Sequence, residues 1–219
     1  MTSRDLFIDS AKESVKIFFN SIAQGYKVPT SIGKCIKAFD SIWMSRINQV
    51  VFDQRIKSYN GSLIVERINQ IWNERSDEVV GVNFPIEVSI SKNVILNDRI
   101  DLLLINRKNK GKITYRAINF FDMNSNDNER YLHLRAGVFK MAMQSYLGQH
   151  TRRNYAYEVW PFNGEQIFID PKNTDRIDLA RLVLNISKAI RQEIWFPTSS
   201  EETCKQCPYK KNCTFSLIL

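Results

Sequence analysis

Apolar residues recur at a roughly helical period over residues 4–24, and Gly25 follows as a stop signal. The segment Pro29-Thr30-Ser31 opens a second predicted helix, in which we expect Thr or Ser to cap the N-terminus through its side-chain oxygen. The dipeptide Asn60-Gly61 interrupts the pattern, and a third predicted helix follows it. The chain therefore begins with a predicted helical part.

The pattern changes at residue 79 to short runs rich in β-branched and aromatic residues, which predict consecutive strands. These runs are VVGVNFPIEVSI, NVILN, RIDLLLIN and ITYRAINFF, with turns at Asn93 and over residues 106–112. Residues 130–148 return to a helical period and are followed by two predicted strands, NYAYEVWPF and EQIFID, around Asn163-Gly164. A last helix is predicted over residues 174–195, where Phe196-Pro197 ends it.

This order of elements predicts an α/β (α+β) fold, in which a central mixed β-sheet is flanked by helices. We expect a single domain over residues 1–219, because 219 residues with 43% hydrophobic content can bury one sizeable core. Within it, residues 1–75 form the helical part, residues 79–195 the core of sheet and helices, and residues 196–219 a cysteine-rich tail.

The sequence has no apolar stretch of about 18 residues, which argues against a membrane span. Its first residues, MTSRDLFIDSAKES, are too polar for a secretory signal, so we expect a cytoplasmic protein.

The formal net charge of +8 favours a polyanionic partner, although each basic cluster can equally be a solvated turn or tail. The densest clusters are at residues 106–112, 151–153 and 205–211. The candidate nucleic-acid-binding residues in the first two are Lys108, Lys110, Lys112, Arg152 and Arg153.

Four cysteines form a candidate metal site. Cys204, Cys207 and Cys213 have the spacing C-x2-C-x5-C in the tail, and Cys35 lies far upstream. Four thiolates suit a tetrahedral zinc ion or a four-iron cluster. Two disulfides or free core thiols are the alternatives, and a cytoplasmic location disfavours disulfides.

The stretch LNDRIDLLLI followed by YRAINFF has the layout of two neighbouring strands that would carry metal-binding acids in a nuclease. Together with SIGKCIKAFDSIWM, the helix RAGVFKMAMQSYL and the tail FPTSSEETCKQCPYKKNC, it resembles the PD-(D/E)XK nuclease superfamily in its RecB-like iron–sulfur branch. That branch includes CRISPR-adaptation exonucleases and AddB-type nuclease domains. The resemblance runs nearly end to end and implies that the four cysteines hold a 4Fe–4S cluster, with zinc as the alternative.

The resemblance also implies a degenerate active site. Asp101 matches the first metal-binding acid, but the second acid falls on Asn119 and the lysine on Phe121. Val65 stands in place of the usual histidine, and the Gln-x3-Tyr pair falls on Arg135 and Phe139. Since losing one preorganised electrostatic donor costs roughly a hundred- to a thousand-fold in rate, we expect essentially no nuclease activity.

Relocated ligands are the alternative that would keep an active, Mg²⁺- or Mn²⁺-dependent nuclease. Asp122 is the foremost substitute acid, with Asp98 and Asp127 also near, and Lys140 or Arg116 could supply positive charge. Three functions therefore follow: an inactive nuclease-like protein that binds nucleic acid, most simply DNA, within a larger DNA-processing or defence complex; an active nuclease; and a purely structural subunit. In the first, Arg135 would face a phosphate and replace the charge of the metal.

Overall fold

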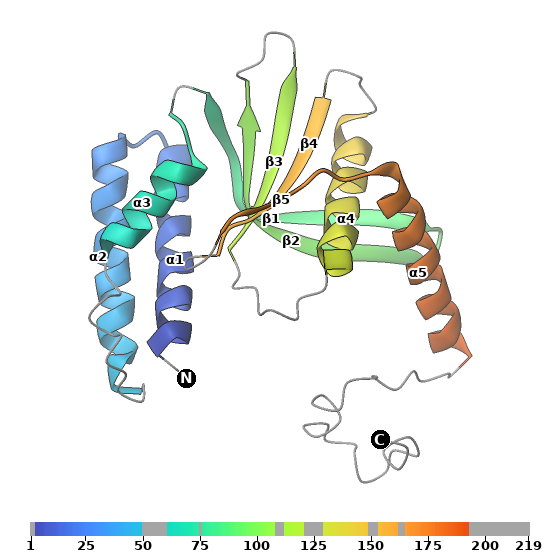
Figure 1. Cartoon of the computed structure of the whole chain (residues 1–219), viewed down its shortest axis with the longest axis horizontal. Coiled ribbons are helices and arrows are strands. Elements are labelled where there is room, and N and C mark those ends of the chain that lie inside the picture. Colours follow the sequence, from blue (N-terminus) through green and yellow to red (C-terminus); the bar gives the residue numbers. More distant parts are fainter. Residues whose placement is uncertain are drawn as a thin grey trace. The chain divides into compact units, whose positions relative to one another are not determined.

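A computed structural model describes residues 3–49, 61–74, 76–107, 112–120, 129–148, 153–161 and 165–192. Helices come first, then a three-stranded meander, a helix, two more strands and a last helix (Figure 1). The bounds are α1 Ser3–Ala23, α2 Val28–Arg46, the short 3-10 helix η1 Ile47–Gln49, α3 Gly61–Ile71, β1 Asp77–Ser91, β2 Val94–Asn106, β3 Ile113–Asn119, α4 Glu129–Leu147, β4 Arg153–Val159, β5 Ile167–Ile169 and α5 Asn173–Arg191.

The five strands form one mixed sheet in the order β1-β2-β3-β4-β5. Neighbouring strands are antiparallel except β3 and β4, which are parallel. Parallel neighbours need a crossover connection, and α4 lies in that connection. The predicted α+β class, with a mixed sheet flanked by helices, is confirmed.

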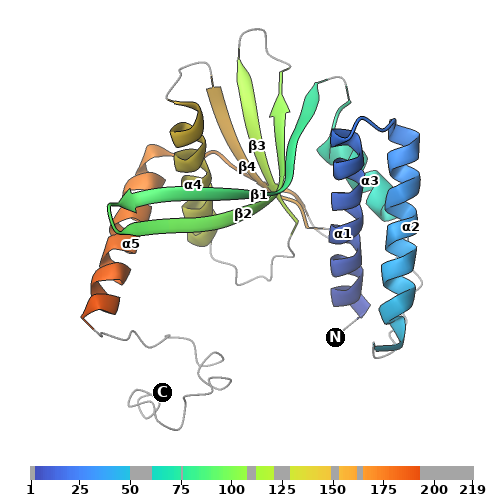
Figure 2. The same ribbon diagram turned by 180° about the vertical axis from the view of Figure 1, so that it is seen from behind.

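Alternation along β3 and β4 sends side chains to two differently covered faces of the sheet. On one face, Ile118 and Trp160 join the apolar core formed with α1, α2 and α3. On the other face, the ring of Tyr155 stacks on Tyr115 and meets Phe139 of α4 edge to face. The three N-terminal helices and α4 therefore lie on opposite sides of the sheet (Figures 1 and 2).

The hairpin of β1 and β2 continues past the end of β3 and crosses α4 (Figure 2). The backbone amide of Glu87 on β1 donates a hydrogen bond of 2.9 Å to the hydroxyl of Tyr146 on α4. Asn83 lies within β1 at the positive φ of 52°, a left-handed conformation unusual for a strand residue. The hairpin therefore pairs with β3 near one end and contacts α4 near its other end.

The helix ends test two predictions. Gly25 follows α1 with a φ of +83°, and the bonds from Tyr26 N to Ser21 O and from Gly25 N to Ile22 O complete a Schellman motif, so the predicted stop is confirmed. The predicted Ser or Thr cap of α2 is wrong. The N-cap is Lys27, which makes no side-chain cap bond, because Pro29 already lies inside the first turn.

The chain divides into two compact units, Met1–Leu179 and Ala180–Leu219, with the boundary inside α5. The expectation of a single domain stays a prediction. Within the described ranges, no helix has both the length and the apolar character needed to cross a membrane.

Candidate functional site

Asp101 and Asn119 lie side by side where the β2–β3 ladder ends. The antiparallel register pairs Leu102 with Ile118, so that Asp101 and Asn119 are the next residues beyond this pair on the two strands. The amide of Asp101 donates to Asn119 Oδ1 at 3.4 Å, and the amide of Phe120 donates to Asp101 Oδ2 at 2.9 Å. The two positions expected from sequence to hold the acids of a metal site are therefore adjacent.

A lysine from α1 reaches this pair. The ammonium nitrogen of Lys16 lies 3.1 Å from Asp101 Oδ1, and the two side chains are 13% and 22% exposed. The same nitrogen lies 3.4 Å from an Oε of Glu13. A partly covered ion pair of this kind is screened less by salt than a pair on the open surface. Both oxygens of the Asp101 carboxylate are thus engaged by the protein itself.

The donors among the described residues do not suit a divalent cation. Mg²⁺ binds through oxygen ligands, usually one or two carboxylates with water and substrate phosphate. Here Asp101 is the carboxylate, Asn119 contributes a neutral amide, and Lys16 already places a positive charge 3.1 Å from the carboxylate. Within the described ranges, no group of three or more His, Cys, Asp or Glu side chains could hold a metal ion.

A second ion pair lies between β2 and α4. Arg135 donates from Nε to Asp98 Oδ2 at 3.0 Å and from an Nη to Asp98 Oδ1 at 2.8 Å, a bidentate arrangement. Burial by itself would lower the pKa of Arg135, but Tyr157 and Asp98 outweigh it and the pKa is raised. Arg135, which was expected to contact nucleic acid, is therefore paired with Asp98, one of the expected substitute acids.

Two buried polar groups beside these pairs have no hydrogen-bond partner among the described residues. They are Nδ2 of Asn119, whose residue is 2% exposed, and the hydroxyl of Tyr157, whose residue is 1% exposed. Burial raises the pKa of Tyr157, against the opposing charge of Arg135. The phenol is therefore a neutral hydrogen-bond donor over the whole ordinary pH range.

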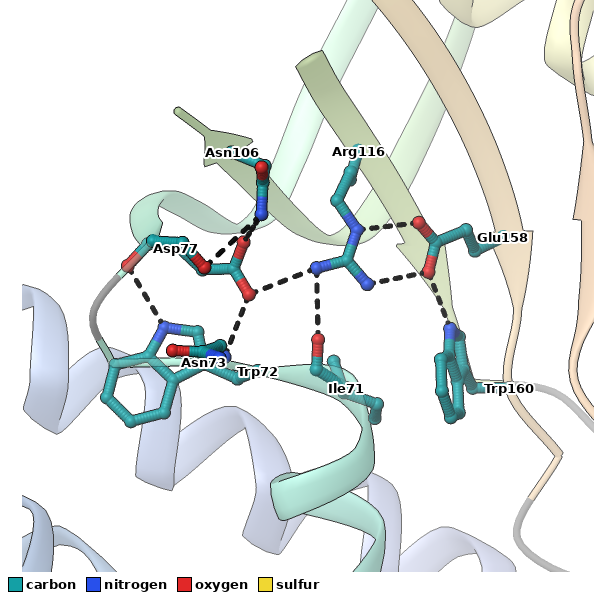
Figure 3. A network of polar contacts seen from close by, with 9 residues as sticks. Ile71, Trp72, Asn73, Asp77, Asn106, Arg116, Glu158 and Trp160 are labelled. Atoms are coloured by element: carbon teal, nitrogen blue, oxygen red, sulfur yellow. Dashed lines mark hydrogen bonds and ion pairs between the residues drawn. The ribbon is translucent and has the colours of Figure 1, made fainter. Parts of the chain in front are cut away.

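A third polar cluster lies on the opposite face of the sheet, against α3, and is centred on Arg116 (Figure 3). Arg116 donates to both oxygens of Glu158 at 2.7 and 2.9 Å, to Asp77 Oδ2 at 3.2 Å and to the carbonyl of Ile71 at 3.0 Å. The indole of Trp160 donates to the Glu158 carboxylate at 2.8 Å.

Each member of this cluster has its partners. Asp77 accepts further bonds from the amide of Asn73 at 2.8 Å and from the side chain of Asn106. Burial would lower the pKa of Arg116, but Glu158 and Asp77 outweigh it and raise the pKa. Arg116 therefore balances two buried carboxylates, and the cluster is best understood as structural.

The other residues expected from sequence to act in the site are spread over the chain. Lys140 donates to the carbonyl of Pro171, Arg153 to the carbonyls of Leu147 and Gly148, and Phe139 is fully buried. Lys112 is exposed immediately before β3, and Val65 is half-buried in α3. Outside the described residues lie Lys108, Lys110, Phe121, Asp122, Asp127, Arg152, Cys204, Cys207 and Cys213.

Cys35 is the described member of the predicted four-cysteine site. It is fully buried in the apolar core with α1 and α3, and burial raises its pKa to about 12. Metal ligation requires a thiolate, which this apolar environment disfavours. Ligation by Cys35 would therefore need either the charge of the metal beside the sulfur or an opening between the helices.

Lys16 and Tyr157 are site residues that the sequence pattern does not predict. Lys16 had no specific signal, because a lysine in an amphipathic helix is normally solvated. Tyr157 had none either, because an aromatic residue in a strand normally belongs to the core.

No protein-family model matches the sequence, and no curated protein matches it. Among solved structures, the chain is similar to a protein named "Putative exonuclease" from Eubacterium rectale, with 9% identity and a TM-score of 0.44, over 92% of this chain and 74% of that one. It is also similar to SSO0001, with 14% identity and a TM-score of 0.37, over 78% of each chain. Similarities this distant carry no argument about function.

Proposed function

We propose that the chain is a nuclease-like protein without metal-dependent cleavage activity that binds nucleic acid. The observation that carries the proposal is the state of Asp101. Its carboxylate is held by the Lys16 ammonium at 3.1 Å and by the Phe120 amide at 2.9 Å, beside an amide at Asn119. A side-chain cation bound to the acid supports a site that works without a metal.

The net charge of +8 supports a polyanionic ligand. We expect binding to single- or double-stranded DNA or RNA to weaken steeply as salt rises, because counterions are released from the nucleic acid on binding. Filter binding at several salt concentrations tests this expectation. Absence of salt-sensitive binding to every nucleic acid tried would refute the proposal.

The alternative is an active nuclease with relocated groups. In it, Lys16 from α1 would act as the catalytic lysine beside Asp101, but the amide of Asn119 in place of the second acid disfavours metal binding there. Incubation of the full chain with DNA and Mn²⁺ distinguishes the two. Cleavage that disappears in Asp101→Ala would favour the active enzyme over our proposal.

We also propose that the four cysteines bind a 4Fe–4S cluster in the cell. The support is the C-x2-C-x5-C spacing with one remote partner and the nuclease resemblance. Protein purified without oxygen should be brown and absorb near roughly 400 nm. The colour should be lost in Cys207→Ser, and stoichiometric zinc in colourless protein would overturn the assignment.

A further inference from the structure

Asn119 and Tyr157 place two unused hydrogen-bond donors in one buried part of the candidate site. Almost all buried polar groups in folded proteins have a partner, whether protein, water or ligand. Here Asn119 Nδ2 and the Tyr157 hydroxyl have none among the described residues, although both residues are at least nine-tenths buried. Their partner therefore lies outside the described residues, and water, a ligand or the rest of the chain can supply it.

The strand register brings the two donors to the same face. In the parallel pair β3–β4, Asn119 lies opposite Val159, and Tyr157 lies opposite Ala117. Because side chains alternate along a strand, Asn119 and Ala117 share a face, and so Asn119 and Tyr157 are diagonal neighbours. Long side chains in such positions reach one another's surroundings.

Two cations flank these donors. Lys16 lies 3.1 Å from Asp101, which is bonded to Asn119 through its amide. Arg135 interacts electrostatically with Tyr157 and forms the bidentate pair with Asp98. Each cation is balanced by a carboxylate, so a ligand in this place is selected by the hydrogen bonds it accepts more than by net charge.

A ligand that satisfies Asn119 and Tyr157 together must offer several acceptor oxygens and no competing donor, and a phosphate group does so. Building on the proposed nucleic-acid binding, we infer that Asn119 and Tyr157 form the floor of a subsite for a terminal phosphate of a nucleic-acid strand, flanked by Lys16 and Arg135. A terminal phosphate fits better than an internal phosphodiester, because it offers three free oxygens as acceptors instead of two.

Tyr157→Phe tests the subsite and has a matched control. It removes the hydroxyl and keeps the ring. Tyr155→Phe removes a second buried hydroxyl without a partner among the described residues, from the same strand and face but next to Tyr115 and Phe139. Neither change removes a described hydrogen bond, so both variants should unfold at or above the temperature of the wild type.

Fluorescence anisotropy with dye-labelled oligonucleotides in EDTA compares strands that carry a 5′-phosphate, a 3′-phosphate or neither. We expect the wild type to prefer one phosphorylated end, and Tyr157→Phe to lower that preference roughly 10- to 100-fold, the usual effect of losing one hydrogen bond to a charged group. Asn119→Asp, which replaces the donor by an acidic oxygen, should abolish the preference, and Tyr155→Phe should retain it.

The outcomes separate this subsite from the proposed function. Equal binding of all three strands by the wild type, or a preference that survives in Tyr157→Phe and Asn119→Asp, would overturn the subsite and leave nucleic-acid binding intact. Protection of the wild type, but not of Tyr157→Phe, by inorganic phosphate in thermal unfolding would support the subsite. If phosphate protects the wild type in this way but no oligonucleotide binds, the phosphate site stands and the nucleic-acid ligand is rejected.

Discussion

Arg116→Met should destabilise the protein strongly, because it leaves two buried carboxylates without their common cation. The side chains of Asp77 and Glu158 are each only 3% exposed, and Arg116 is 15% exposed. Methionine keeps much of the length of the side chain but donates no hydrogen bond. It therefore removes two bonds to Glu158, one to Asp77 and one to the carbonyl of Ile71.

The magnitude follows from the burial of the partners. Removing one member of a buried ion pair typically costs about 3–5 kcal/mol, since the remaining charge is desolvated and uncompensated. For a domain of this size, about 1 kcal/mol lowers the melting temperature by roughly 2–4 °C. We therefore expect a loss of about 3–5 kcal/mol and a fall in melting temperature of roughly 6–20 °C.

Urea denaturation followed by circular dichroism measures this loss, and Arg107→Met is the matched control. Arg107 also makes two bonds to one carboxylate, that of Glu78, at 2.9 and 3.2 Å, but the two side chains are 54% and 62% exposed. An exposed pair contributes about 0–1 kcal/mol. If Arg116→Met loses no more stability than Arg107→Met, the cluster does not stabilise the fold as we argue.

Three further changes test other parts of the structure. Burial raises the pKa of Cys35 to about 12 in the folded protein. The metal-free protein should therefore lose stability as pH rises above about 9, by up to about 1.4 kcal/mol per pH unit. Urea titrations at several pH values measure this slope, which Cys35→Val should lack. Asn83→Val should cost about 1–2 kcal/mol in the same assay, since a β-branched residue tolerates the φ of 52° poorly, whereas Asn83→Gly should cost nothing. Asn119→Asp combined with Lys16→Met places a second carboxylate beside Asp101 and removes the Lys16 cation. Mn²⁺ at about 100 times its dissociation constant should therefore stabilise this variant by about 2.7 kcal/mol and the wild type not at all. Calorimetry that shows equal shifts in melting temperature for both proteins would contradict this account of the site.

The elements of the fold could be predicted from the sequence because their signals are local. The period of apolar residues located α1, and Gly25 marked its end through a conformation that glycine adopts easily. The predicted cap of α2 was wrong because Thr30 and Ser31 suit an N-cap by residue type, whereas the helix begins before them with Pro29 in its first turn. The observed cap, Lys27, lies three to four residues before Thr30 and Ser31, and it makes no side-chain cap bond that a sequence pattern could signal.

The candidate site was only partly predictable. The adjacency of Asp101 and Asn119 could be expected, since both stand at related positions on consecutive strands. The partners of the charged residues could not, because Lys16 meets Asp101 and Arg135 meets Asp98 from distant parts of the chain. Each of these pairings depends on where a helix docks on the sheet, which no local pattern encodes.

The cluster around Arg116 also bears on the kinetics of folding. Its bonds join residues that are 39, 42 and 45 positions apart, and the bond to Glu158 requires β4 to have docked beside β3 after the crossover through α4. Contacts between such distant residues close large loops and tend to form late. We therefore expect Arg116→Met to speed unfolding far more than it slows folding, so that this cluster governs how long the folded protein persists.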